Sequence, residues 1–501
     1  MKNQVLHIGN ILNNGYLHCK YLHTRGVNAE CLNLDYTHCQ GQPEWSEVRI
    51  ESPVAHWDED WKSIDLGGFV RPAWYHQVVT AELAALAATL GADVTPVSTG
   101  GADGSDGGRV LEPITRGLKS GLRRCRLDGV ARRVLGRLRR INPLPNPPAD
   151  AQTVFARTVI ADYDRFYPDA PTRLTTQDVI AHMPRAEALR PILAQFPLIQ
   201  GYSLDPILAL LGSPGRPFLC YEHGTMRDFP FEDSARGRLY ALALKKAEKI
   251  FITNVDCIGS ARRLGLDNWV FIPHLIDDER FKPAVSPERA RLLERFNCDH
   301  LILCPARHHW KNAPDANPNS WLKGNDVLIH GLGKFFAERP AIRAHVIFFD
   351  WGLEVDLSKA LIGELGFADR VHWEPIRSKL SMLDLYNAAD VVCDQFNPGL
   401  ASFGATVPEA LACAKPIISI LNRETHSWGF PILPPVVDGG DAECVQQSLL
   451  RLFGSAETRR QIGEEGLAWF REHHSSKLVI DRMISVYAEV AERFGWNWSF
   501  N

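Results

Sequence analysis

The sequence predicts an α/β protein with two domains, each built around a parallel β-sheet. Short apolar runs of the buried-strand type alternate with segments of helical pattern along much of the chain, and such alternation favours parallel sheets with right-handed crossovers. At 501 residues the chain is too long for one hydrophobic core and suits two domains of about 250 residues. Its hydrophobic content of 45% and charged content of 23% are ordinary for a soluble globular protein.

The N-terminal half opens with a short strand and a polar turn. Residues 5–8 are apolar, and the turn that follows contains Gly9, Asn10, Asn13 and Asn14. Ligands of open parallel sheets bind at the carboxyl ends of the strands, where such turns lie. We therefore expect this turn to approach a ligand; the alternative is a tight turn without one.

A basic segment with flexible flanks interrupts the N-terminal half. Residues 97–109 are rich in Gly and Ser, which predicts a flexible surface loop, and residues 142–150 form a Pro-rich connector. Between them, in residues 116–141, many arginines lie opposite an apolar stripe. Basic amphipathic helices bind anionic membrane surfaces, so this segment is a candidate membrane contact. The alternative is a solvated helix docked on the N-terminal domain.

A second loop, YEHGTMRDFPF at residues 221–231, follows a predicted strand at 217–220. A histidine and a glutamate beside glycine at the end of a strand suit chemistry near a substrate. His223 is the main candidate for that role, and Arg227 would bind a substrate or brace the loop. Asp205, in the segment YSLDP, is a weaker candidate. The alternative for His223 is a structural histidine.

The C-terminal half shows the clearest alternation of strand and helix. Strands are predicted at residues 301–304, 345–349, 370–373 and 391–393. Several of them end in polar or Pro-containing loops, as expected at the ligand-binding edge of a Rossmann-like sheet. The final stretch, residues 479–493, has a helical pattern.

The most informative stretch is ASFGATVPEALACAKPIISI at residues 401–420. A small turn through Gly404, Ala405 and Thr406 leads into a Pro and then Glu409, which are signals of a helix start. Free N–H groups at a helix N-terminus attract phosphate, whereas a carboxylate would repel it. Glu409 therefore suits hydroxyls, such as those of a ribose. Together these features suggest a nucleotide-diphosphate site; the alternative is an ordinary capped helix.

This stretch resembles the signature of the GT-B glycosyltransferases, specifically of the retaining family 4 (glycosyltransferase group 1) type. Residues 252–274 are similar to the passage between the two domains of that family, and residues 323–326 (KGND) to its donor-site turn. Residues 221–225 resemble an active-site loop. The resemblance is best over roughly residues 200–485. One departure is Ala401, where the family has a first Glu.

The resemblance implies two Rossmann-like domains that face each other across a cleft. It implies residues 1–275 as the acceptor domain, residues 276–480 as the donor domain, and residues 481–501 as a helix that crosses back to the first domain. The implied activity is of the hexosyltransferase type: a sugar passes from a nucleotide-diphosphate sugar to an acceptor hydroxyl with retention. No metal or other cofactor is implied.

The residues of the implied site divide by role. Arg307 and Lys323 would hold the donor diphosphate, because positioned cations stabilise the charge that develops on a leaving diphosphate. Glu409 would hold the ribose, and His223 would contact the transferred sugar. The other donor-side candidates are Gly9, Asn10, Glu374, Pro375, Ile376, Asp394, Gln395, Gly404, Ala405 and Thr406. The acceptor-side candidates are Asn13, Asn14, Asp205 and Arg227.

Composition, cysteine pattern and fold bear on the other functions and partners. A net charge of −4 gives no general attraction to nucleic acid. Eleven scattered cysteines without a C-x-x-C pair predict reduced thiols and a cytoplasmic location, with residues 116–141 as a candidate contact to the inner face of a membrane. Glycan, lipid-linked and small-molecule acceptors all stay open. The alternative functions are a nucleotide-sugar epimerase or a phosphorylase on the same fold, or a non-catalytic nucleotide-sugar-binding protein.

Overall fold

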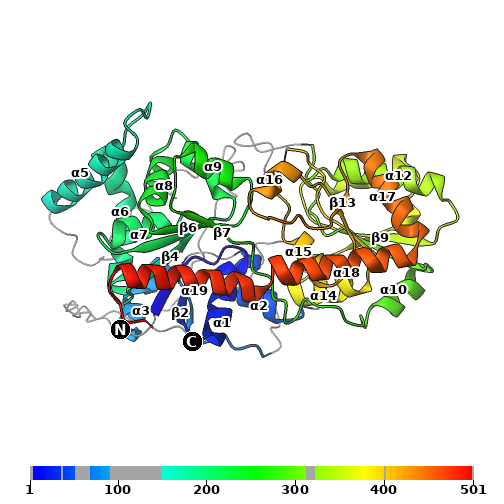
Figure 1. Ribbon diagram of the computed structural model, residues 1–501, viewed down its shortest axis with the longest axis horizontal. Helices are drawn as coiled ribbons and strands as arrows, with labels where there is room; N and C mark the ends of the chain where they lie inside the picture. Colours follow the sequence, from blue (N-terminus) through cyan, green and yellow to red (C-terminus); the bar gives the residue numbers. More distant parts are fainter. Residues whose placement is uncertain are drawn as a thin grey trace, which may run out of the picture.

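The computed structural model describes residues 4–34, 38–50, 68–90, 149–311, 322–399 and 402–498. Two parallel sheets organise these residues, one of seven strands and one of six. Figure 1 shows them at opposite ends of the long axis of the molecule, with the blue to green elements around the first sheet and the yellow-green to orange elements around the second. The predicted α/β fold with two parallel sheets is confirmed.

The first sheet has the strand order β3-β2-β1-β4-β5-β6-β7. Its strands are β1 (Gln4–Ile8), β2 (Asn28–Leu34), β3 (Tyr75–Val78), β4 (Leu198–Tyr202), β5 (Phe218–Tyr221), β6 (Lys249–Ile252) and β7 (Trp269–Phe271). Helices α1 (Asn14–Thr24), α2 (Pro43–Glu47), α3 (Leu83–Thr89), α5 (Ala149–Phe166), α6 (Thr176–Leu193), α7 (Pro206–Gly212), α8 (Ala235–Lys246) and α9 (Cys257–Arg263) accompany it. Every residue of β4 and β5 is buried, as expected of parallel strands covered on both faces.

The second sheet has the strand order β10-β9-β8-β11-β12-β13. Its strands are β8 (His300–Leu303), β9 (Ala344–Phe349), β10 (Val371–Glu374), β11 (Val391–Cys393), β12 (Ile417–Ser419) and β13 (Val437–Asp438). Its helices are α10 (Arg289–Phe296), α12 (Asn325–Glu338), α13 (Val355–Glu364), α14 (Lys379–Ala388), α15 (Thr406–Ala412), α16 (Arg423–Ser427), α17 (Ala442–Gly454) and α18 (Ala456–His473). The predicted strands of this half are all present, within a residue or two of their expected bounds.

The last helix, α19 (Ser476–Arg493), packs on the first sheet. Its residues Met483 and Tyr487 are fully buried in one apolar cluster with Val5 and Leu198. Figure 1 shows α18 and α19 nearly end to end in red tones, α18 beside the second sheet and α19 beside the first. The predicted domain boundary near residue 275 falls between β7 and β8 and stays a prediction.

Some predicted features lie outside the described residues. They are the Gly- and Ser-rich loop, the basic segment 116–141 and nearly all of the Pro-rich connector, together with Ala401. The membrane contact of residues 116–141 therefore stays a prediction. Across the part of the chain that the structure describes, we find no helix with the length and apolar character that a membrane crossing requires.

Candidate active site

A cavity of about 440 Å³ lies between the two sheets. Loops at the carboxyl ends of strands from both sheets form its wall, because parallel strands bring these ends to one edge of each sheet. The loop after β5 contributes His223 and Arg227, and the loop after β8 contributes Arg307. The segment after β11 contributes Asp394 and Gln395.

The predicted site residues separate into two sets. The residues in the cavity wall are Asn14, His223, Arg227, Arg307, Lys323, Ile376, Asp394, Gln395, Gly404, Ala405, Thr406 and Glu409. Those outside the wall, among the described residues, are Gly9, Asn10, Asn13, Asp205, Glu374 and Pro375. The second set shows that a sequence pattern of neighbouring residues cannot decide which side chains reach the cavity wall.

The glycine and two of the asparagines near β1 shape their own turn. Gly9 has φ +100°, and a Cβ there would come within 2.3 Å of Asp205 Oδ2. The Asn10 side-chain amide donates to Asn13 Oδ1 at 2.9 Å and to the carbonyl of Gly41 at 2.7 Å. Asn13 donates to Ser46 Oγ at 2.7 Å. These polar groups therefore hold the turn together behind the cavity wall.

Glu374 lies in a cluster of charged side chains. It shares a 2.6 Å hydrogen bond with His372 and accepts one of 3.0 Å from Arg377 Nε. Burial opposes the charge of Glu374, but the hydrogen bonds from His372 and Arg377 outweigh burial and lower its pKa to about 2. Arg377 and Ile376, rather than Glu374, line the cavity.

Lys323 is a buried cation at the start of α12. Its ammonium group donates to the neutral Gln395 Oε1 at 2.8 Å. Burial, and then the nearby charge of Arg307, lower the pKa of Lys323 to about 8, while Asp394 opposes this shift. Two cations in the wall of one cavity favour a ligand with more than one negative charge.

Asp394 and Gln395 connect Lys323 to the turn before α15. The Gln395 amide donates to the carbonyl of Ser402 at 2.6 Å, and the Gly404 N–H donates to Asp394 Oδ2 at 3.4 Å. Burial raises the pKa of Asp394, and Lys323, Gly404 and Thr406 oppose that rise. The turn and the ammonium group of Lys323 are thereby held in a fixed relation.

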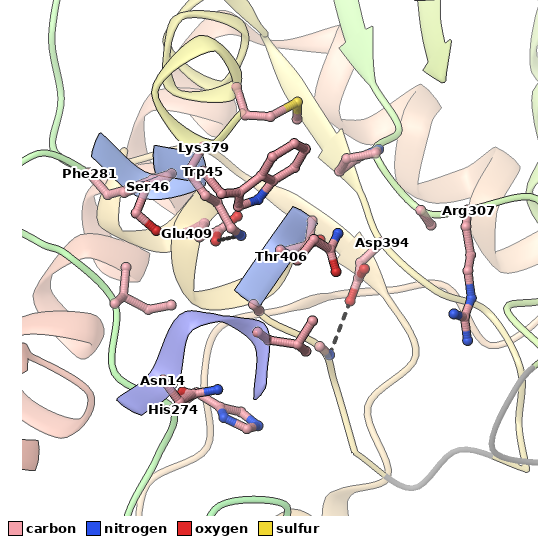
Figure 2. Close-up of a pocket in the computed structure, with 18 of the residues that line it drawn as sticks. Asn14, Trp45, Ser46, His274, Phe281, Arg307, Lys379, Asp394, Thr406 and Glu409 are labelled. Carbon is pink, nitrogen blue, oxygen red and sulfur yellow. Dashed lines mark hydrogen bonds and ion pairs between the residues drawn. The ribbon is translucent and has the colours of Figure 1, made fainter. Parts of the chain in front are cut away.

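Glu409, on α15, faces two residues of α14. It accepts hydrogen bonds from Lys379 Nζ and, at 2.8 Å, from Tyr386 Oη. Figure 2 shows Lys379 and Glu409 meeting in the cavity, with Thr406 and Asp394 on the side toward Arg307. We did not predict Lys379 and Tyr386. Their spacing, seven residues apart with Met382 between them, is a helical signal that could have placed all three on one face.

On the other side of the cavity, His223 lies among polar and aromatic groups. Its ring packs edge to face on that of His274, with 4.6 Å between centroids, and its Nδ1 is 3.5 Å from Asn14 Nδ2. Burial and Arg227 lower the pKa of His223 to about 4, so the imidazole is neutral near pH 7. Arg227 binds both carboxylate oxygens of Asp256, at 2.5 and 2.9 Å.

Two negative findings concern metals and disulfides. Within the described ranges, no three His, Cys, Asp or Glu side chains come together as metal ligands. The cysteines that the structure describes are free thiols.

Comparisons with known proteins identify the fold of the chain. No family model matches the chain. The α,α-trehalose 6-phosphate synthase of Burkholderia multivorans superposes with a TM-score of 0.53 over 98% of this chain and 100% of that chain, at 9% sequence identity. The chain has the GT-B fold. Anabaena HepE, solved in complex with UDP and glucose, has a TM-score of 0.49 and 14% identity over 70% of this chain and 98% of that chain.

One curated sequence relative is named as a glycosyltransferase. The D-inositol 3-phosphate glycosyltransferase of Thermomonospora curvata is 30% identical over an alignment of 182 positions, which covers 33% of this chain and 40% of that protein. The chain thus spans less than half the length of this relative. The predicted resemblance to GT-B glycosyltransferases is confirmed.

Proposed function

We propose that this protein is a glycosyltransferase that moves a sugar from a nucleotide-diphosphate sugar to an acceptor hydroxyl, with retention and without a metal. One observation carries the proposal: a cavity between two parallel sheets, with Lys323 and Arg307 on one side and His223 on the other. The GT-B fold and the name of the curated relative support the same activity.

Lys323 and Arg307 would hold the donor diphosphate, with the backbone of Gly404–Thr406 as a further set of donors. Negative charge grows on the diphosphate as the bond to the sugar breaks. Cations that are already in place stabilise this charge more than they stabilise the bound substrate, which lowers the barrier. These two side chains supply positive charge of the kind that a metal ion provides in other enzymes.

Glu409 would accept hydrogen bonds from the ribose hydroxyls of the donor. A carboxylate has about four acceptor positions, and Lys379 and Tyr386 account for two of them. Both partners also fix the direction of the carboxylate. Ribose hydroxyls can therefore add to the existing contacts without displacing them.

His223 would orient the transferred sugar, and Asn14 and Arg227 would lie toward the acceptor. In the proposed step, the bond from the anomeric carbon to the diphosphate oxygen breaks, and a bond from that carbon to the acceptor oxygen forms on the same face. The acceptor proton passes to the departing phosphate oxygen, and a nucleoside diphosphate leaves. This step requires no nucleophile from the protein, and the resemblance to retaining enzymes supports it.

The first test is thermal stabilisation by UDP-, GDP-, ADP- and dTDP-sugars. A ligand at 100 times its Kd should stabilise the folded protein by about 2.7 kcal/mol. We expect one nucleotide to raise Tm, and Lys323→Ala and Glu409→Ala to reduce that rise at equal ligand concentration. Lys334→Ala is the matched control, because Lys334 lies exposed on α12 and binds Glu443 at 2.7 Å.

Turnover completes the test. The donor that stabilises the protein should release its nucleoside diphosphate faster when an acceptor hydroxyl is supplied, and the sugar should appear on the acceptor. Stabilisation by none of the four donors, or binding without either hydrolysis or transfer, would argue against the proposed function.

A further inference from the structure

A short segment that follows β2 crosses from the first sheet to the second. Helix α2 packs against α14. Beyond it, Arg49 forms a bidentate ion pair with Asp384, with 3.1 Å between Nη2 and Oδ1. Ser378 Oγ donates to the carbonyl of Val48 at 2.7 Å and accepts from the N–H of Ile50 at 3.3 Å. Residues 43–50 are therefore anchored to helix α14 beside the second sheet by an ion pair and by hydrogen bonds between the Ser378 hydroxyl and the backbone of residues 48 and 50.

Trp45 is the aromatic residue of this segment. It is 4% exposed and belongs to an apolar cluster with Val48, Ile50 and Ile376. Ile376 follows β10, so this cluster joins the segment at 43–50 to the second half of the molecule. Trp45 also lines the cavity. Figure 2 shows its indole projecting into the cavity beside Lys379 and Glu409.

The position of Trp45 relative to Glu409 suggests what it contacts. If Glu409 binds the ribose, as the proposed function holds, the base attached to that ribose must occupy the neighbouring part of the cavity. The lining there includes apolar side chains from both halves of the molecule, namely Ile376, Met382 and Trp45, and Trp45 packs in one cluster with Ile376. Flat nucleobases stack on aromatic side chains, and indole offers a large face for this contact.

We propose that Trp45 forms one wall of the nucleobase subsite, so that the base is held between the two halves of the molecule. The inference rests on the proposed function and adds a specificity-determining residue to it. In the proposed function the diphosphate contacts would come from Lys323, Arg307 and the turn at 404–406, which line the cavity around the second sheet. The base is then the part of the donor nucleotide that also contacts the segment at 43–50, and Arg49 positions that segment through Asp384.

The proposal separates ligands that carry a base from those that do not. The experiment is isothermal titration calorimetry on the full chain with UDP, GDP, ADP, dTDP and inorganic diphosphate. We expect Trp45→Ala to raise the Kd of the nucleotide that the wild-type protein binds by about tenfold or more. The Kd of inorganic diphosphate should stay within about twofold of the wild-type value, because that ligand does not reach Trp45.

Three further variants sharpen the test. Trp45→Phe keeps a ring and should weaken nucleotide binding less than Trp45→Ala does. Arg49→Ala removes the contact to Asp384 and should weaken binding of the nucleotide but not of inorganic diphosphate. These two milder changes also carry the test if Trp45→Ala does not fold. Trp74→Ala is the matched control, since Trp74 stacks on Tyr16 and His23 outside the cavity wall and should leave both affinities unchanged.

Three outcomes would contradict these proposals, and they can be told apart. An equal loss of affinity for nucleotide and inorganic diphosphate would make Trp45 a structural support and overturn the proposal. Unchanged or tighter nucleotide binding in Trp45→Ala would overturn it as well, because a stacking wall would then be absent. Failure of the wild-type protein to bind any of the four nucleotides would instead contradict the proposed function, and this inference with it.

Discussion

Lys323 illustrates how burial changes the pKa of a single side chain. A lysine in water stays charged well beyond pH 10, but burial and the charge of Arg307 lower the pKa of Lys323 to about 8. Its ammonium group donates to the neutral Gln395, so the attraction of this cation remains available to an anion. The protonation state of Lys323 therefore changes with pH just above neutrality.

The first prediction at this scale is a pH dependence of donor binding. Lys323 is charged below its pKa of about 8 and neutral above it, so affinity for a nucleotide diphosphate should be high below that pH. Above it, affinity should fall by up to about tenfold per pH unit. Titration calorimetry between about pH 6.5 and 10 measures this.

Lys323→Arg is the control for that prediction. A guanidinium group stays protonated over this whole range, so the variant should bind with an affinity that changes little with pH. A wild-type affinity that is flat from pH 7 to 10 would mean that Lys323 does not contact the diphosphate.

At the scale of elements, the turn that carries Lys323 into α12 depends on one glycine. Gly324 has φ +68°, and a Cβ there would approach the carbonyl carbon of Phe396 to 2.5 Å and the nitrogen of Asn397 to 2.7 Å. Both are backbone atoms of the segment that follows β11, so neither can move away by a side-chain rotation. The glycine of the KGND motif is thus explained by the close approach of two backbone segments, in addition to the ligand-binding role predicted for the motif.

We expect Gly324→Ala to lower the free energy of unfolding by about 2 kcal/mol or more, from backbone strain and the clash together. Urea unfolding followed by circular dichroism measures the change. Gly363→Ala is the matched control, because Gly363 lies within helix α13 and nothing lies within 4 Å of its Cβ position. That change should be neutral or stabilise the protein by up to about 1 kcal/mol. Equal effects of the two substitutions would contradict the packing argument.

Across the whole molecule, the C-terminal helix completes the core of the first sheet. Tyr487 of α19 is fully buried and donates to Gln200 Oε1 at 2.7 Å, and the Gln200 amide donates to Tyr202 Oη at 2.9 Å. His7 and His18 also contact that hydroxyl, at 2.7 and 2.6 Å. The last helix and the first strand therefore meet in one buried polar network.

The corresponding prediction concerns Tyr487. Tyr487→Ala should lower the free energy of unfolding by about 3–5 kcal/mol, because it removes a large buried ring. Tyr487→Phe keeps the ring but leaves Gln200 Oε1 without this donor, at a cost of about 1–3 kcal/mol. The midpoint of urea unfolding compares the two variants with the wild-type protein. A Tyr487→Ala protein as stable as the wild type would show that α19 is not part of this core.

Local pattern was enough to predict β1, β5, β8, β9, β10 and β11 and several residues of the cavity wall. Parallel strands covered on both faces must be apolar throughout, and β8 and β11 stand out in the sequence for that reason. Glu409 was found because a helix start is recognised from neighbouring residues, and Lys323 because the KGND motif resembles the donor-site turn of the GT-B glycosyltransferases. Their presence in one cavity follows from the parallel topology, which brings the strand ends to the same edge.

Pairings between distant residues were settled only by the tertiary structure. Glu374, a donor-side candidate, accepts a hydrogen bond from Arg377, and Arg377 in turn donates to Glu288, which is 89 residues away in the sequence. Likewise, Glu409 meets Lys379, which is 30 residues away in the sequence, and Trp45 packs in one apolar cluster with Ile376. Burial and hydrogen bonding in such contacts depend on how the two sheets face each other. Residue spacing carries no information about that arrangement, whereas it does specify strands, turns and helix starts.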